Sequence, residues 1–177
     1  MSGKTYDPVQ KPQQMAKDSF ISKQGESMIT KIVSGKDHSI LLTTDGHVFG
    51  WGDCESGKIG RMLKSRNRKN QGMMIERVHA KGAQDVFCGA NHSFYVNKKG
   101  EVFAWGLNNH GQLGIGHKEN MATPQKVKEL SGIKLKSITG GEHHSMALSE
   151  EGEVYCWGRN DEGQCGLGDR YEQYRRE

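Results

Sequence analysis

The feature that most constrains this chain is a segment that occurs three times. Residues 35–60, 89–114 and 141–166 align without a gap, and each begins Gly-x-x-His-Ser and contains Val-Phe/Tyr-x-Trp-Gly. The tryptophans of this motif are 54 and 52 residues apart, and one turn glycine keeps that spacing: Trp51, Trp105, Trp157, Gly46, Gly100 and Gly152. A period of this length is typical of propellers and arrays, in which a unit buries its apolar faces only against its neighbours.

Each repeat predicts a β-hairpin. Ser39–Thr43 and its equivalents form one strand, a Gly-containing turn follows, and His47–Trp51 and its equivalents form the returning strand. An apolar-rich run precedes each hairpin, at 29–33, 83–87 and 135–138. The Pro-containing segment 123–127 predicts an outer edge strand. Four strands per unit make a propeller blade.

The repeats define the expected domain organisation. We expect an all-β segment of about three blades, near 29–82, 83–134 and 135–169. Residues 1–28 hold two of the three prolines and little periodicity, which predicts a flexible or partly ordered leader. Residues 170–177 follow the third Gly-rich stretch directly and are expected to be the tail of a truncated repeat. The 24 glycines and the 33% apolar content suit short strands joined by tight turns.

Composition also limits the class of protein. No stretch approaches the roughly 18 consecutive apolar residues of a membrane span, and the polar N-terminus lacks the apolar core of a signal peptide. A soluble intracellular protein is predicted. The four cysteines form no Cys-x-x-Cys pair, so we expect reduced thiols, with neither disulfide nor metal site: Cys54, Cys88, Cys156 and Cys165.

Three histidines occupy the same place in the repeat, directly before a serine: His38, His92 and His144. A residue required in every blade favours a structural role, in which a buried imidazole bonds to the backbone of a neighbouring blade. Metal ligation is less favoured because no three or four ligands are spaced to converge. The three tryptophans are expected to pack between blades, each with an indole N–H that needs an acceptor.

The position before these histidines varies, reading Asp37, Asn91 and His143. A variable polar residue at a fixed place on a rim loop is suited to specific contacts with a partner. The alternative is an ordinary solvated loop.

The net charge of +4 is unevenly spread. Between Glu55 and Glu76 the chain has six basic residues and no acidic one: Lys58, Arg61, Lys64, Arg66, Arg68 and Lys69. This run predicts an electrostatic contact surface, with a solvated loop as the alternative.

Other apparent sites have simpler explanations. The Gly-rich stretches 111–116 and 163–168 lack the Lys-Ser/Thr and the strand–loop–helix setting of a phosphate loop. The neighbouring carboxylates at 150–151 and 161–162 lie beside turn glycines, where they should be solvated. The sequence therefore predicts no cofactor, no metal and no small-molecule substrate, and disfavours a hydrolase carried on a propeller.

The repeat pattern resembles that of the regulator of chromosome condensation family, whose members are seven-bladed propellers. Residues 85–90 and the insert at 60–72 strengthen the likeness, which covers about 29–169 and corresponds to the fourth, fifth and part of the sixth repeat. The resemblance implies a nuclear, chromatin-associated guanine-nucleotide exchange factor for the small GTPase Ran, acting without covalent chemistry. An interaction scaffold without exchange activity is the alternative.

The resemblance also implies site residues. Asp37, Arg61 and His143 would belong to the face that engages Ran. The insert would reach the acidic patch of the nucleosome's histones, with DNA as a further partner, through Lys64, Arg66, Arg68 and Lys69. The family has a further functional histidine where this chain has Gly111, which leaves open whether the adjacent His110 replaces it.

The family's catalytic wedge lies in a blade before these repeats, and nothing in residues 1–28 resembles it. We therefore expect an incomplete propeller that is inactive alone. Unpaired blade edges should also make the isolated chain prone to associate.

Overall fold

The computed structural model describes residues 11–15, 27–61 and 75–168, and in this part of the chain almost all regular structure is β-strand. Helix is limited, among these residues, to two single 3-10 turns, η2 (Glu55–Gly57) and η4 (Lys128–Leu130). The predicted leader lies largely outside the described residues, and the predicted tail lies wholly outside them.

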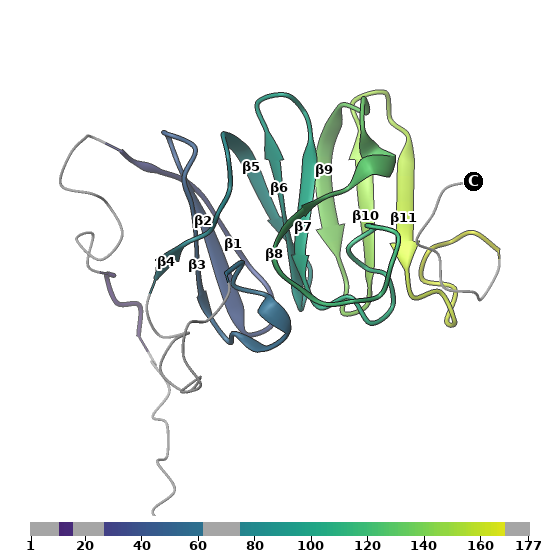
Figure 1. Ribbon diagram of the computed structural model, residues 1–177, viewed down its shortest axis with the longest axis horizontal. Coiled ribbons are helices and arrows are strands. Elements are labelled where there is room, and N and C mark those ends of the chain that lie inside the picture. The colour runs from purple at the N-terminus through teal and green to yellow at the C-terminus, as the bar shows by residue number, and fades with distance from the viewer. Residues whose placement is uncertain (1–10, 16–26, 62–74, 169–177) are drawn as a thin grey trace, which may run out of the picture.

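The strands form three antiparallel sheets that follow the chain in order. Blade 1 contains β1 (Ile29–Ser34), β2 (His38–Thr43), β3 (Val48–Gly52) and β4 (Glu76–Arg77). Blade 2 contains β5 (Ala83–Cys88), β6 (His92–Asn97), β7 (Val102–Gly106) and β8 (Met121–Lys126). Blade 3 contains β9 (Leu135–Gly140), β10 (His144–Ser149) and β11 (Val154–Gly158). The three sheets stand side by side in chain order (Figure 1).

The predicted hairpin is present in each blade, with the same register in all three. In blade 1, His38 pairs with Gly52 and Ser39 with Trp51, so the His-Ser and Trp-Gly motifs face each other across the hairpin. Blades 2 and 3 repeat these pairs. The turn glycines have φ of 79°, 76° and 87° in Gly46, Gly100 and Gly152, a left-handed conformation that side-chain-bearing residues adopt at a cost.

The apolar core lies at the junctions between blades. Between blades 1 and 2, which we call junction 1, Ile40 and Val48 share a cluster with Val86, Tyr95 and Trp105. Between blades 2 and 3, which we call junction 2, a second cluster holds a further set: Phe87, Phe94, Val102, Leu113, Ile138, Ala147 and Trp157. Blade 2 thus buries both of its faces, whereas blades 1 and 3 each bury, in the described chain, the face that meets blade 2.

The predicted fold class is confirmed: the described chain is a three-blade segment of a β-propeller. The predicted outer strand at 123–127 is also present, as β8, which starts two residues earlier and ends one residue earlier.

Candidate functional site

The loops before β2, β6 and β10 lie at the same end of the three sheets, which we call the histidine rim. They are residues 35–37, 89–91 and 141–143, and η2 lies at this end too, at the bottom of Figure 1. The backbone joins these loops across blades, since Lys36 N donates to Ala90 O at 2.8 Å and Ala90 N donates to Gly141 O at 2.9 Å. The rim is therefore one continuous hydrogen-bonded surface.

The residues at the variable position are held in the same way in each blade. The backbone oxygens of Asp37, Asn91 and His143 accept hydrogen bonds of 2.7, 3.0 and 2.9 Å from the residue that follows each Trp-Gly motif. Their side chains are therefore presented at equivalent points along the rim.

At junction 1, a buried histidine of one blade bonds to the next blade. His38 Nε2 lies 2.8 Å from Ser93 Oγ, and Ser93 Oγ donates to the backbone oxygen of Lys58 at 3.4 Å. The indole of Trp105 donates to the same oxygen at 3.0 Å. One carbonyl of blade 1 thus accepts two hydrogen bonds from blade 2.

Junction 2 repeats this arrangement with shorter distances. His92 Nε2 lies 2.7 Å from Ser145 Oγ, which donates to the backbone oxygen of Gln112 at 2.7 Å. Trp157 Nε1 donates to that oxygen at 2.9 Å. Because the serine proton is directed to the carbonyl, Ser145 Oγ accepts from the N–H at Nε2 of His92. His92 is therefore the neutral tautomer protonated at Nε2.

Both junction histidines are neutral near pH 7. Burial lowers the pKa of His38 to about 4, with a smaller contribution from the Lys58 ammonium, and burial lowers that of His92 to about 3. The ring of His92 fills space opened by Gly89, where a Cβ atom would overlap the imidazole. The sequence-based hypothesis of a bond to the neighbouring backbone needs one correction: the direct partner is a serine hydroxyl, which in turn reaches the backbone.

The third repeated histidine, His144, is only half-buried in the described chain. Burial lowers its pKa as well. At the other end of the described repeats, Trp51 is also half-buried, whereas Trp105 is fully buried. The repeat positions therefore differ in burial according to the blades that flank them.

Of the three residues predicted to face a GTPase, Asp37 and His143 lie on loops of the histidine rim. Asp37 is exposed on the loop before β2. Arg61, in the β3–β4 connection, forms an ion pair with Glu76 on β4. His143 packs instead against His110, a residue of the loop that follows β7.

The His110–His143 pair lies where the loops of blades 2 and 3 meet. Their ring centroids are 4.8 Å apart and the rings are tilted by 54°. The pKa of each is lowered, first by burial. The Arg159 guanidinium lowers that of His110 further, and the repulsion that would arise if both rings were charged lowers that of His143. Arg159 is held by Asp161 at 2.5 Å. Two neutral imidazoles therefore lie side by side at junction 2.

Lys58 is a rim residue whose role the sequence did not reveal. Its side chain is only 7% exposed, and Nζ lies 2.7 Å from Asp53 Oδ2 and 3.2 Å from Asn91 Oδ1. The expectation that it belongs to a free cationic run is therefore wrong. The sequence held two indications of this internal role. Asp53 lies five residues earlier, and glutamine replaces the lysine in the other two repeats.

The remaining predicted contact residues, Lys64, Arg66, Arg68 and Lys69, lie outside the described residues. Within the described ranges, no group of three His, Cys, Asp or Glu side chains is arranged to hold a metal ion. No helix of that part is long and apolar enough to span a membrane. The four cysteines are free thiols, and burial raises the pKa of Cys88 to about 11, which makes it a poor nucleophile.

Comparison with known proteins extends these observations. Residues 2–177 match the family model described as the RCC1-like domain. Protein pim1 of Schizosaccharomyces pombe is 41% identical over 146 residues, 80% of this chain and 27% of pim1. The probable human E3 ubiquitin-protein ligase HERC6 is 40% identical over 144 residues, 81% of this chain and 14% of HERC6.

A solved structure is also similar to this chain. Prp20p of Saccharomyces cerevisiae, described together with its binding to Gsp1p and histones, superposes with a TM-score of 0.70 and 29% identity. The match covers 76% of this chain and 32% of Prp20p. The chain thus spans about a third or less of these relatives.

Proposed function

Because the chain belongs to the RCC1-like domain family, we propose that it forms part of a propeller that binds a Ran-type small GTPase and takes part in guanine-nucleotide exchange. The observation that carries the proposal is the likeness to Prp20p, which is described by its binding to Gsp1p and histones. The 41% identity to pim1 supports membership of the same family.

The proposed contact surface is the histidine rim. Asp37 offers an exposed carboxylate, Arg61 a guanidinium held by Glu76, and His143 a neutral imidazole. Asp37 and His143 stand on loops joined by backbone hydrogen bonds, so little ordering of these loops is needed on binding.

Exchange of this kind needs no covalent step. A propeller that binds the nucleotide-free GTPase more tightly than the loaded one weakens nucleotide binding by the same factor, because the two affinities are linked. The residues of the rim therefore act by binding, and their effect on exchange follows from their contribution to the affinity for the empty GTPase.

We further propose a nuclear, chromatin-associated location, with the basic insert contacting histones. Arginine suits an acidic protein surface because its planar guanidinium binds carboxylates in a bidentate way. Replacing both Arg66 and Arg68 by alanine should weaken nucleosome binding, and the wild-type interaction should weaken as salt rises. Unchanged nucleosome affinity in the double variant would exclude the insert as a nucleosome contact.

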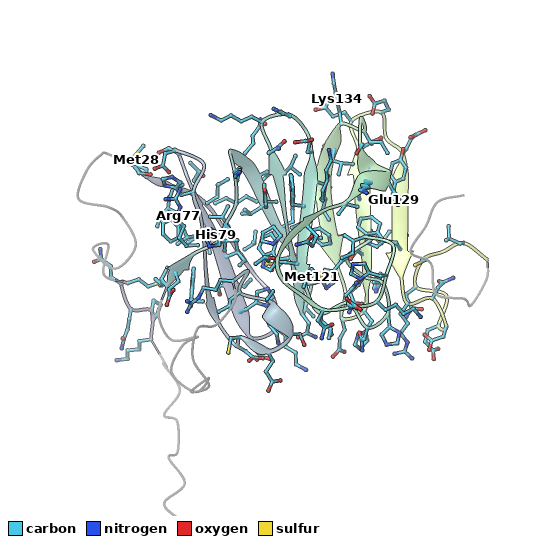
Figure 2. The ribbon with its side chains drawn as sticks, viewed as in Figure 1. Met28, Arg77, His79, Met121, Glu129 and Lys134 are labelled. Carbon is cyan, nitrogen blue, oxygen red and sulfur yellow. The ribbon has the colours of Figure 1, made fainter. Side chains whose placement is uncertain are left out.

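The GTPase proposal is tested by measuring binding of this chain to nucleotide-free Ran and nucleotide release by a Prp20p chimera that carries these blades. Asp37→Ala and His143→Ala should each reduce both quantities, with little change in melting temperature. The matched control is Lys134→Ala, since Lys134 lies at the end opposite the histidine rim (Figure 2). Equal binding by the rim variants and the control would refute the assignment of this face.

An interaction scaffold without exchange activity is the second candidate. HERC6, a probable E3 ubiquitin-protein ligase, matches this chain nearly as well as pim1 does, at 40% against 41% identity. Failure of both the chain and the chimera to bind nucleotide-free Ran would favour the scaffold.

A further inference from the structure

The two junctions differ at one equivalent point of the histidine rim. At junction 1, the Lys58 ammonium lies between Asp53 and Asn91, 2.7 and 3.2 Å from their oxygens. A positive charge is therefore built into that junction, bound by side-chain oxygens of two successive blades.

At junction 2 the repeat replaces every member of this group. Gln112 stands in place of Lys58, Leu107 in place of Asp53, and His143 in place of Asn91. His110 stands in place of Ser56 and brings a second imidazole against the first. Junction 2 therefore has no ammonium at this point but has two nitrogen ligands.

We infer that His110 and His143 form a binding site for a divalent transition-metal ion, which occupies at junction 2 the place that the Lys58 ammonium has at junction 1. Imidazole nitrogen is a preferred ligand of Zn²⁺, Ni²⁺ and Cu²⁺. The sequence alone predicted no metal site, because these two residues are 33 positions apart and come from different repeats.

The spacing of the rings fits one shared ion. With a metal–nitrogen distance of about 2.0–2.1 Å, each ring centroid lies about 3.2 Å from the ion, and ligand angles of about 90–109° separate two centroids by roughly 4.5–5.2 Å. The observed centroid separation of 4.8 Å falls in this range. His143 Nδ1 is buried and has no hydrogen-bond partner among the described residues, so it is available as a donor.

The surroundings make this an open site. No third His, Cys, Asp or Glu of the described chain completes the group, so water or a partner's side chain fills the other positions. Asp161 and Glu142 add negative charge near the pair, which the Arg159 guanidinium partly offsets. Such a site could join the rim to a carboxylate of a bound protein.

The test is calorimetric titration of the untagged 177-residue chain with NiCl₂. We expect one site per chain, and His110→Gln and His143→Asn should each weaken its affinity at least tenfold. His143→Asn introduces the residue that the repeat itself has at Asn91. The matched control is His79→Gln, an exposed histidine away from the pair, which should leave the affinity unchanged.

Two further measurements sharpen the result. Co²⁺ bound to the chain should show ligand-field bands without a thiolate charge-transfer band, which excludes the cysteines. The double variant Gln112→Lys, Leu107→Asp introduces the lysine and aspartate of junction 1 and should lower Ni²⁺ affinity at least tenfold. Its melting curve checks that it folds. Absence of binding by the wild-type chain, or full affinity in either the histidine variants or the lysine variant, overturns the assignment.

Discussion

Junctions 1 and 2 use the same hydrogen bonds but differ in charge. In each, a histidine meets a serine of the next blade, and a serine and a tryptophan share one backbone oxygen. Junction 1 adds the ion pairs Lys58–Asp53 and Lys31–Asp85, both at 2.7 Å.

Junction 2 has an aromatic side chain, Phe94, at the repeat position where junction 1 has Ile40. Phe94 meets Trp157 edge to face, with centroids 6.1 Å apart. The comparison teaches that the repeat fixes the histidine, serine and tryptophan contacts and leaves the rest of each junction free to vary.

The largest expected effect is loss of the fully buried histidine. His92→Ala should lower the free energy of unfolding by about 3 kcal/mol, because it removes a packed ring and leaves Ser145 without its donor. His38→Ala should cost less, about 2 kcal/mol, since the Cys88 thiol lies 3.6 Å from Ser93 Oγ and can replace part of the contact. Urea unfolding followed by tryptophan fluorescence measures both.

The half-buried His144 is the internal control, and its replacement by alanine should have the smallest effect of the three. If His144→Ala proves as damaging as His92→Ala, burial between blades is not the source of the stabilisation.

Low pH should destabilise both junctions, and the loss at junction 2 should extend over a wider range of pH. A histidine whose folded pKa lies below its unfolded value of about 6.5 binds its proton preferentially in the unfolded chain, so stability is full above pH 6.5 and falls as pH drops. Each histidine should contribute a loss of about 1.4 kcal/mol per pH unit, ending near pH 4 for His38 and near pH 3 for His92.

The measurement is the urea midpoint between pH 7.5 and pH 5, in the wild-type chain and in His92→Gln. The variant should show a shallower dependence on pH. If the wild type and the variant show parallel curves of urea midpoint against pH, protonation of His92 is not linked to unfolding.

A smaller effect should separate the junctions by charge. Asp53→Ala leaves the Lys58 ammonium with Asn91 alone and should cost about 1 kcal/mol, because the lysine is nearly buried while the aspartate is one-third exposed. The matched control is Asp161→Ala on the same rim, where the pair with Arg159 is exposed and no measurable loss is expected. Equal losses, measured by thermal unfolding, would remove the distinction between the nearly buried Lys58 pair and the exposed Arg159 pair.

The repeat predicted the hairpins because Ser39, the turn glycine and Trp51 recur at fixed spacing. It also predicted that the indoles need acceptors. It did not predict that Lys58 would be internal or that His110 would meet His143. Those contacts join different blades, and they depend on how one sheet turns against the next, which spacing along the chain does not encode.

The serine and tryptophan of each junction end on a main-chain oxygen, that of Lys58 or Gln112. Every amino acid carries that atom, so the residue at this position can change without loss of the inter-blade hydrogen bonds. Positions 58 and 112 are therefore natural sites for diversification. A protein built by joining such blades can therefore carry a different buried side chain at each junction while the hydrogen bonds between blades stay the same.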